Sequence, residues 1–264
     1  MDCDYEVNVP RQTVELDGYE LSFRVPNEIT QWRIEHLVAV EPITIAWILG
    51  FAPEDILVDI GAGIGVFTVT AALCRHTQVY AFEPQAQSFA VLCGNIEDNG
   101  LNELVNAWPA AITDTSGFDI LNVMHSGAGN AHHSFGEAVN YNLHPQKFLS
   151  SQGSVSTTLD YLVAEGVVPV PTHIKIDVDG FEYKVIAGAA ATLKNPGVRS
   201  VLVEINSGLV QHNQIFGVFR QLGFAHDPEL TERTRRTEGP DERDAGRFGK
   251  PAPVTQILRF GERQ

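Results

Sequence analysis

An apolar run that ends in three evenly spaced glycines restricts the fold of this chain more than any other feature. The run covers residues 56–60, and Gly61, Gly63 and Gly65 lead from it into an amphipathic stretch over residues 66–74. Glycine lets the backbone turn sharply and approach a ligand closely, and a helix that begins there presents its N–H groups to that ligand. The pattern predicts a buried strand, a tight turn and a helix, which together open a doubly wound α/β site of the nucleotide-binding type.

A second strand-like run indicates which ligand this site takes. Residues 78–82 form the run and Glu83 ends it, 22 residues after Gly61, where an acid can bind ribose hydroxyls. Val66 stands where the dinucleotide fingerprint requires a glycine. Asp59, just before the turn, would repel a pyrophosphate and attract an ammonium group. S-adenosylmethionine carries an ammonium, a sulfonium and a ribose but no phosphate, so it is favoured over NAD. An NAD-linked oxidoreductase is the alternative.

The charge balance excludes polyanionic partners. The 264 residues include 33 acids and 18 bases, a formal net charge of −15, which repels nucleic-acid phosphates and anionic membranes. No apolar run reaches transmembrane length, no signal peptide is visible and the three cysteines form no disulfide framework. We therefore expect a cytoplasmic protein without membrane insertion or nucleic-acid binding. A homo-oligomer remains compatible with the sequence.

The order of elements predicts an α/β domain with additions. Residues 1–40 alternate weakly and indicate an N-terminal cap or hairpin, and residues 41–264 form the α/β domain. Residues 113–156, rich in Ser, Gly, His and Asn, interrupt its rhythm and predict an inserted lid. The lid histidines match no zinc spacing and are interpreted as polar surface residues, with a role as general base as the alternative; they are His125, His132, His133 and His144. The polar segment 225–253 is expected to be a loop.

A further strand-like segment, residues 172–180, alternates apolar and charged side chains. Lys175, Asp177 and Asp179 share one side, which is costly in a core strand unless they face a cleft or partners. Ligands bind at the carboxyl ends of strands in an open α/β sheet. We therefore predict that Asp177, with Lys175, belongs to a catalytic cleft. The alternative is that Lys175 neutralises a carboxylate in a structural ion pair.

The next predicted strand ends in Glu204, with Asn206 two residues later. The ends of neighbouring parallel strands adjoin, so Glu204 and Asn206 are expected beside Asp177 and the glycine loop. Carboxylate and amide oxygens suit Mg²⁺, so Asp177, Glu204 and Asn206 are the predicted metal ligands. Asp177, Lys175 and Glu204 are the predicted catalytic residues, with Asp177 acting as a general base or as a ligand to a metal that acidifies a hydroxyl.

In combination these motifs resemble the FkbM family of S-adenosylmethionine-dependent methyltransferases over roughly residues 35–225. The matching segments are Glu41-Pro42, 59–65, 81–84, the pair Asn95 and Asn99, 158–160, 174–182 and 203–205. The resemblance implies a class I methyltransferase fold, which is α/β and Rossmann-like. Such a fold has a seven-stranded, mostly parallel sheet with helices on both faces and an antiparallel last strand.

The resemblance also implies a function. Methyl transfer to an oxygen of a small molecule or sugar is expected, on a natural product or a cell-surface glycan. Glu41 and Asn95 would join Asp59, the three glycines and Glu83 in cofactor binding. Gly63 departs from the family, which commonly has Asn there, but a turn formed by backbone groups tolerates this change. A non-catalytic S-adenosylmethionine-binding protein is the remaining alternative, and the retained charged set at Lys175, Asp177 and Glu204 argues against it.

Overall fold

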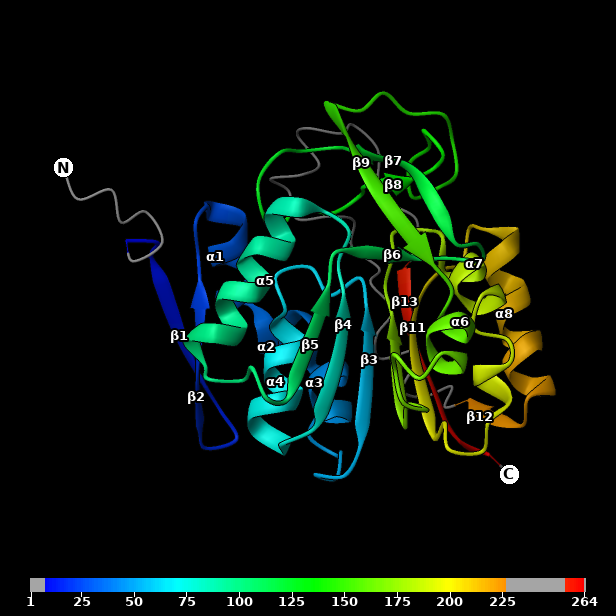
Figure 1. Ribbon diagram of the computed structural model, residues 1–264, viewed down its shortest axis with the longest axis horizontal. Helices are drawn as coiled ribbons and strands as arrows, with labels where there is room; N and C mark the ends of the chain where they lie inside the picture. The colour runs from blue at the N-terminus through cyan, green and yellow to red at the C-terminus, as the bar shows by residue number, and fades with distance from the viewer. Residues whose placement is uncertain (1–7, 227–254, 264) are drawn as a thin grey trace.

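A central seven-stranded sheet organises the protein. The computed structural model describes residues 8–226 and 255–263, shown in Figure 1. The strand order is β12-β13-β11-β10-β3-β4-β5, and β13 runs antiparallel to both of its neighbours while the five strands from β11 to β5 are parallel. The predicted seven-stranded sheet with a reversed last strand is confirmed. Its strands are β3 (Ile56–Ile60), β4 (Gln78–Phe82), β5 (Val105–Trp108), β10 (His173–Ile176), β11 (Ser200–Asn206), β12 (Phe224–His226) and β13 (Thr255–Arg263).

Helices cover both faces of this sheet (Figure 1). Consecutive strand residues point to opposite faces, so Leu57 packs into the core beneath one group of helices and Val58 into the core beneath the other. The first group is α3 (Pro42–Ile48), α4 (Val66–Arg75) and α5 (Ala86–Asp98). The second is α6 (Leu159–Ala164), α7 (Glu182–Ala187) and α8 (Val210–Gln221), with the short 3-10 helix η1 (Thr192–Lys194). Burial on both faces explains why the central strands read as continuous apolar runs.

One predicted helix is shorter than expected. The sequence predicts a helix over residues 181–193, but α7 ends at Ala187. At Gly188 the chain passes so close to the backbone of Thr113 that a Cβ would overlap the Thr113 carbonyl oxygen. The carboxylate of Asp160 then accepts hydrogen bonds from the backbone N–H groups of Ala191 and Thr192, at 2.8 and 2.7 Å. These tertiary contacts replace the helical hydrogen bonds.

The N-terminal residues form a hairpin that packs on α5. Its strands are β1 (Arg11–Leu16) and β2 (Tyr19–Arg24), and two short helices follow, α1 (Glu28–Glu35) and α2 (Leu37–Val40). The amide of Asn99 accepts from the Ser22 N–H at 2.9 Å and donates to the Ser22 carbonyl at 2.7 Å. Asn95 accepts from the Arg24 N–H at 2.7 Å. Asp98 binds the Arg24 guanidinium at 2.8 Å. Polar side chains of α5 and its C-terminal cap therefore hold β2, and on α4 the Arg75 guanidinium pairs with Asp17 in the hairpin turn.

The predicted insertion contains a second sheet. Its order is β6-β9-β7-β8, and Figure 1 shows it beyond the carboxyl ends of the main parallel strands. The strands are β6 (Ala110–Ile112), β7 (Gly117–Val123), β8 (Ser134–Phe135) and β9 (Ser150–Thr157). The position of this second sheet fits a cover over the site. That it opens and closes as a lid stays a prediction, and so do the domain boundaries. The loop expected at 225–253 lies almost wholly outside the described residues. No described helix is both long and apolar enough to cross a membrane.

Candidate active site

The glycine loop between β3 and α4 is held in a left-handed conformation. Gly61, Gly63 and Gly65 have φ values of +78°, +57° and +83°. A Cβ on Gly61 would overlap the Asp177 carbonyl oxygen, and one on Gly65 would overlap the Leu92 side chain. A Cβ on Gly63 would meet no heavy atom of the described residues within 4 Å. Two of the glycines are thus needed for packing, whereas Gly63 borders open space where a ligand can approach the backbone.

Glu83 connects the end of β4 to this loop. Its side chain is 7% exposed, and its two oxygens accept hydrogen bonds from the N–H groups of Gly63 and Gln85, each at 2.8 Å. Burial raises the pKa of Glu83 to about 7, against the opposing effect of these two donors. The carboxylate oxygens retain lone pairs that can accept further hydrogen bonds. Glu83 therefore stands where the sequence predicts a ribose-binding acid.

Asp59 supplies a buried acceptor below the loop. It is fully buried, and its Oδ2 accepts a hydrogen bond from the Thr68 hydroxyl at 2.7 Å. Within the described residues its Oδ1 has no hydrogen-bond partner, and the nearest cation is the Lys175 ammonium at 3.9 Å. A buried oxygen left in this way is costly unless a ligand satisfies it. The arrangement fits a cationic group bound at the glycine loop.

Lys175 and Asp177 form an ion pair at the end of β10. The Lys175 Nζ is 3.0 Å from the Asp177 Oδ2 and 5.0 Å from the centre of the Phe67 ring. Burial alone would lower the pKa of Lys175, but the carboxylates of Asp177, Asp59 and Glu41 outweigh it and raise the pKa above its usual value. Lys175 is therefore charged. Asp177 keeps a side-chain exposure of 37%, so the ion pair reaches the surface of the site.

Glu41 begins α3 beside this ion pair. Its carboxylate accepts a hydrogen bond from the Thr44 hydroxyl at 2.8 Å. Asn95 on α5 is fully buried and donates to the carbonyl oxygen of Ile64 in the glycine loop at 2.7 Å. Asn95 thus supports the loop from behind, and direct contact of either residue with a cofactor stays a prediction.

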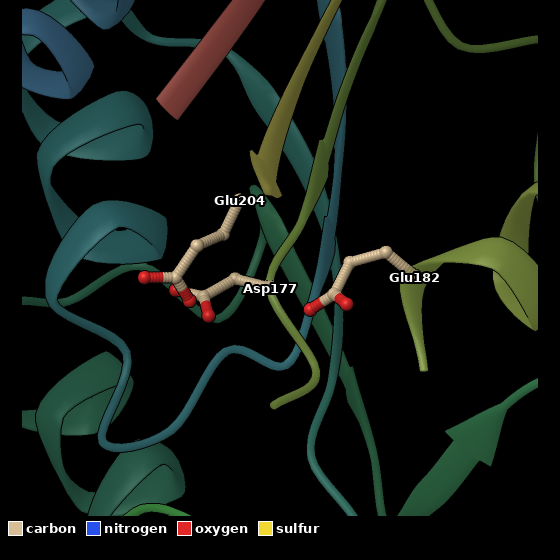
Figure 2. A group of neighbouring side chains, drawn as sticks. All are labelled: Asp177, Glu182 and Glu204. Carbon is tan, nitrogen blue, oxygen red and sulfur yellow. The ribbon is translucent and has the colours of Figure 1, made fainter. Parts of the chain in front are cut away.

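Three carboxylates converge beyond β10 and β11. Figure 2 shows Asp177 and Glu204 close together, with Glu182 pointing toward them from α7, and one oxygen of each lies within 4.8 Å of the others. Glu182 was not among the sequence predictions. It accepts hydrogen bonds from the N–H groups of Val178 and Gly180 at 2.9 and 3.1 Å. The sequence therefore correctly placed Asp177 near Glu204 but missed the third acid, whose role is to hold the turn after β10.

The remaining predicted metal ligand, Asn206, is engaged with the insertion. Its Nδ2 donates to the Asn142 side-chain oxygen at 2.9 Å and to the Tyr141 carbonyl at 3.3 Å. Its Oδ1, the atom that would bind a metal, accepts the Gly208 N–H at 2.9 Å. In this conformation Asn206 anchors the insertion to the end of β11.

A further contact joins the insertion to the turn after β10. The His132 N–H donates to the Asp179 Oδ2 at 2.6 Å, and the His132 Nδ1 is 3.4 Å from the Asp179 Oδ1. Burial would raise the pKa of Asp179, but the hydrogen bonds and charge of His132 hold it below its usual value. The two residues are 47 positions apart, and no spacing rule links them. The sequence offered no signal for this pair beyond the abundance of histidine in the insertion.

These features define the class of protein. The strand order, the reversed β13, the glycine loop after β3 and the acid at the end of β4 are those of a class I S-adenosylmethionine-dependent methyltransferase. The Methyltransferase FkbM domain matches residues 59–225, more than half of the chain. The chain belongs to the FkbM methyltransferase family.

Two known proteins illustrate the similarity. The chain is 29% identical over 199 residues to the hexuronic acid methyltransferase AglP of Haloferax volcanii, which covers 74% of each chain. The crystal structure of methyltransferase FkbM from Methylobacillus flagellatus superposes with a TM-score of 0.51 at 12% identity, covering 87% of this chain. The match spans 52% of that longer chain. The structural likeness supports the fold, and the sequence likeness supports a methyltransferase.

Proposed function

We propose that the protein transfers a methyl group from S-adenosylmethionine to an oxygen atom of a sugar, with a hexuronic acid as the favoured acceptor. The observation that carries this proposal is the combination of open space at Gly63, the buried carboxylate of Glu83 and the unsatisfied oxygen of Asp59 around one loop. Similarity to a hexuronic acid methyltransferase supports the acceptor class. The free thiols of Cys74 and Cys93 agree with a cytoplasmic location, which is also part of the proposal.

The residues present fit this cofactor. The Glu83 carboxylate can accept hydrogen bonds from ribose hydroxyls, and the Asp59 oxygen can accept one from an ammonium group. The bound cofactor would supply an electrophilic methyl on a sulfonium. The chain must then exclude water, align the acceptor oxygen and accept a proton when that oxygen is a hydroxyl. Asp177, which is exposed in the site, is proposed to orient the acceptor, and the buried Lys175 ammonium holds its carboxylate in place.

A resident Mg²⁺ fits the carboxyl edge less well. The Glu182 oxygens already accept backbone N–H groups, and the Asn206 oxygen accepts the Gly208 N–H. The set that remains is Asp177 and Glu204, and Asp177 pairs with Lys175. A hard divalent cation prefers six or more oxygen ligands with little competition from ammonium groups. We therefore propose that methyl transfer needs no metal ion. Turnover should be unchanged in excess chelator.

A hexuronic acid offers two kinds of acceptor oxygen. Its hydroxyls must lose a proton during transfer and give a methyl ether, whereas its carboxylate is already anionic and gives a methyl ester. The two products separate chemically, because mild alkali hydrolyses the ester and leaves the ether intact. Several polar groups of the insertion lie at the same edge of the sheet as Asp177, including His132 and the Asn142 amide, and suit a hydroxylated ligand.

The test uses the purified protein with S-adenosylmethionine and matched glycosides, namely methyl hexuronosides and the corresponding neutral methyl hexosides. Calorimetry first measures binding of S-adenosylmethionine and, as a comparison, NADH. Mass spectrometry then detects the methylated sugar. We expect cofactor binding, and product formation that prefers the hexuronosides. Tight NADH binding without S-adenosylmethionine binding would favour an oxidoreductase. Cofactor binding without methyl transfer to any sugar would contradict the proposed acceptor class.

A further inference from the structure

His132 contacts the carboxylate of Asp179 twice, once through its backbone N–H and once through its imidazole ring. Asp179 accepts the His132 backbone N–H at 2.6 Å, and its other oxygen lies 3.4 Å from the ring Nδ1. The Tyr141 ring packs against the imidazole with a centroid distance of 4.8 Å. The side chain is 48% exposed. Asp179 therefore orients the ring through its Nδ1, and the Nε2 lies on the side of the ring away from Asp179.

The turn that carries Asp179 is rigid. Asp179 has φ +56° and Gly180 has φ +106°, and a Cβ on Gly180 would lie 2.8 Å from the Tyr141 carbonyl oxygen. Glu182 accepts two N–H groups of this turn, and the buried His212 contacts Glu182 at 3.1 Å through Nε2. Because the His212 Nδ1 accepts a backbone N–H, its Nε2 carries the proton and donates it to the Gly180 carbonyl at 3.0 Å, in the same turn. The position of Asp179 is thus fixed from inside the protein.

The pair also lies at the predicted cofactor site. Asp179 follows the strand end that holds Asp177, and its charge acts on Glu83 at the end of β4 as well as being affected by Asp177. Through its contacts with Asp179, His132 therefore lies beside the turn after β10, and the Asp177 carbonyl at the start of that turn packs against Gly61 of the glycine loop. Asp177, by contrast, shares its charge with the Lys175 ammonium at 3.0 Å.

We propose that His132 is the general base of the methyl transfer and that Asp179 is the residue that positions its ring. The proposal rests on the proposed function and on a hydroxyl as the acceptor. As the acceptor oxygen bonds to the methyl carbon, the carbon–sulfur bond breaks and its electron pair returns to sulfur, which becomes a neutral thioether. The hydroxyl proton passes to the His132 Nε2, and the Asp179 carboxylate stabilises the imidazolium that results. A carboxylate–imidazole pair of this kind is a common device for proton removal.

The test compares His132→Gln with His144→Gln, a matched change at an exposed histidine of the same insertion. We expect His132→Gln to lower kcat about a hundredfold or more while the Kd for S-adenosylmethionine changes less than about threefold. His144→Gln should behave like the parent protein. In His132→Ala, added imidazole should restore part of the activity in proportion to its concentration, which a purely structural role would not produce.

The role of Asp179 has its own measurement. The charged and titratable groups that face the His132 ring or Asp179 are Asp177, Glu83, His133 and the phenol of Tyr141. Removing only the Asp179 charge, in Asp179→Asn, should lower kcat and move the acidic limb of its pH profile to lower pH, because the imidazolium loses its stabilising partner. The conservative Asp179→Glu variant should restore part of the rate.

The outcomes separate this proposal from the function on which it rests. A parent protein that methylates hydroxyls while His132→Gln keeps normal kcat overturns the general base and leaves the function intact. Loss of cofactor binding along with kcat in a folded His132→Gln protein also overturns it, in favour of a structural role. If the product is an alkali-labile ester alone, no base is required and the assignment falls. A parent protein that binds S-adenosylmethionine but methylates no sugar overturns both.

Discussion

Replacing Glu83 by alanine removes a side chain that connects the second parallel strand to the glycine loop. The carboxylate holds the Gly63 and Gln85 N–H groups at 2.8 Å, and in the complex it would also accept hydrogen bonds from the ribose. A hydrogen bond to a charged acceptor contributes about 1.5–3 kcal/mol. Loss of about 2 kcal/mol corresponds to roughly thirtyfold weaker binding of S-adenosylmethionine. The backbone of the loop should remain folded, because Gly61 and Gly65 are fixed by other contacts.

The raised pKa of Glu83 adds a pH dependence to this prediction. With a pKa of about 7 the group is largely protonated at pH 6, and a protonated carboxyl is a weaker acceptor for the ribose. If only the ionised form binds the cofactor, affinity at pH 6 should be roughly tenfold below that at pH 8. The effect of pH on folding stability has the opposite sign to its effect on cofactor affinity. The native protein holds a proton that the unfolded chain releases near pH 4.5, so the free energy of unfolding should fall as pH rises from about 4.5 to about 7.

Calorimetry with S-adenosylmethionine at pH 6, 7 and 8 measures the loss of affinity in Glu83→Ala and the pH dependence of affinity in the parent protein. Glu83→Gln should bind weakly and show no pH dependence over this range, and Glu165→Ala, an exposed acid after α6, should match the parent protein. Circular dichroism would confirm that each variant is folded. Parent-like affinity in Glu83→Ala, or a parent affinity that does not change with pH, would refute the reasoning.

The other predictions concern catalysis, the loop, the hairpin and the insertion. Asp177→Asn should fold and bind S-adenosylmethionine by calorimetry yet methylate the sugar about a hundredfold more slowly, because the acceptor loses a group that orients it, and a near-normal rate would exclude that role. Gly61→Ala should abolish cofactor binding, because its Cβ overlaps backbone, whereas Gly63→Asn should keep it, since Asn tolerates φ +57° and no described atom lies in its way. Asp98→Asn should lower the free energy of unfolding in urea by about 2 kcal/mol at pH 7. The guanidinium groups of its partners hold the Asp98 pKa below its ordinary value of 3.8, so parent and variant should converge only as the pH falls below that value toward the lowered pKa. Hydrogen exchange in residues 113–156 should slow on adding cofactor and acceptor, and strong protection there without ligand would contradict a mobile lid.

The fold was predictable where burial determines the local pattern. The runs at 56–60 and 78–82 have the bounds of β3 and β4. These elements are buried on one or both faces and begin and end at turn residues, so the apolar pattern alone marks them. The helix after β10 was overestimated, since contacts with Thr113 and Asp160, distant in sequence, end it early.

Within the site, the sequence predicts the positions of those residues that lie at the carboxyl ends of strands. The sequence places Glu83, Asp177 and Glu204 at one edge of the sheet because the carboxyl ends of parallel strands meet there, and the structure has them at that edge. Glu182 was missed, and His132 was not distinguished from the other histidines of the insertion, because their contacts depend on how the insertion folds back over that edge and on a buried partner from α8. Such pairs carry no fixed spacing, so pattern reasoning cannot select one histidine of the insertion over another.

Asn95 in α5 and Asn99 at its C-terminal cap have a consequence for aggregation during folding. Four residues along a helix rise about 6 Å and two residues along a strand about 6.6 Å, so side chains at Asn95 and Asn99 match the backbone groups of Arg24 and Ser22. The helix therefore imitates a neighbouring strand for β2. An unpaired strand edge is a template for aggregation with other chains. Here that edge is occupied by side chains of the same molecule, in a register that a one-residue slip would destroy.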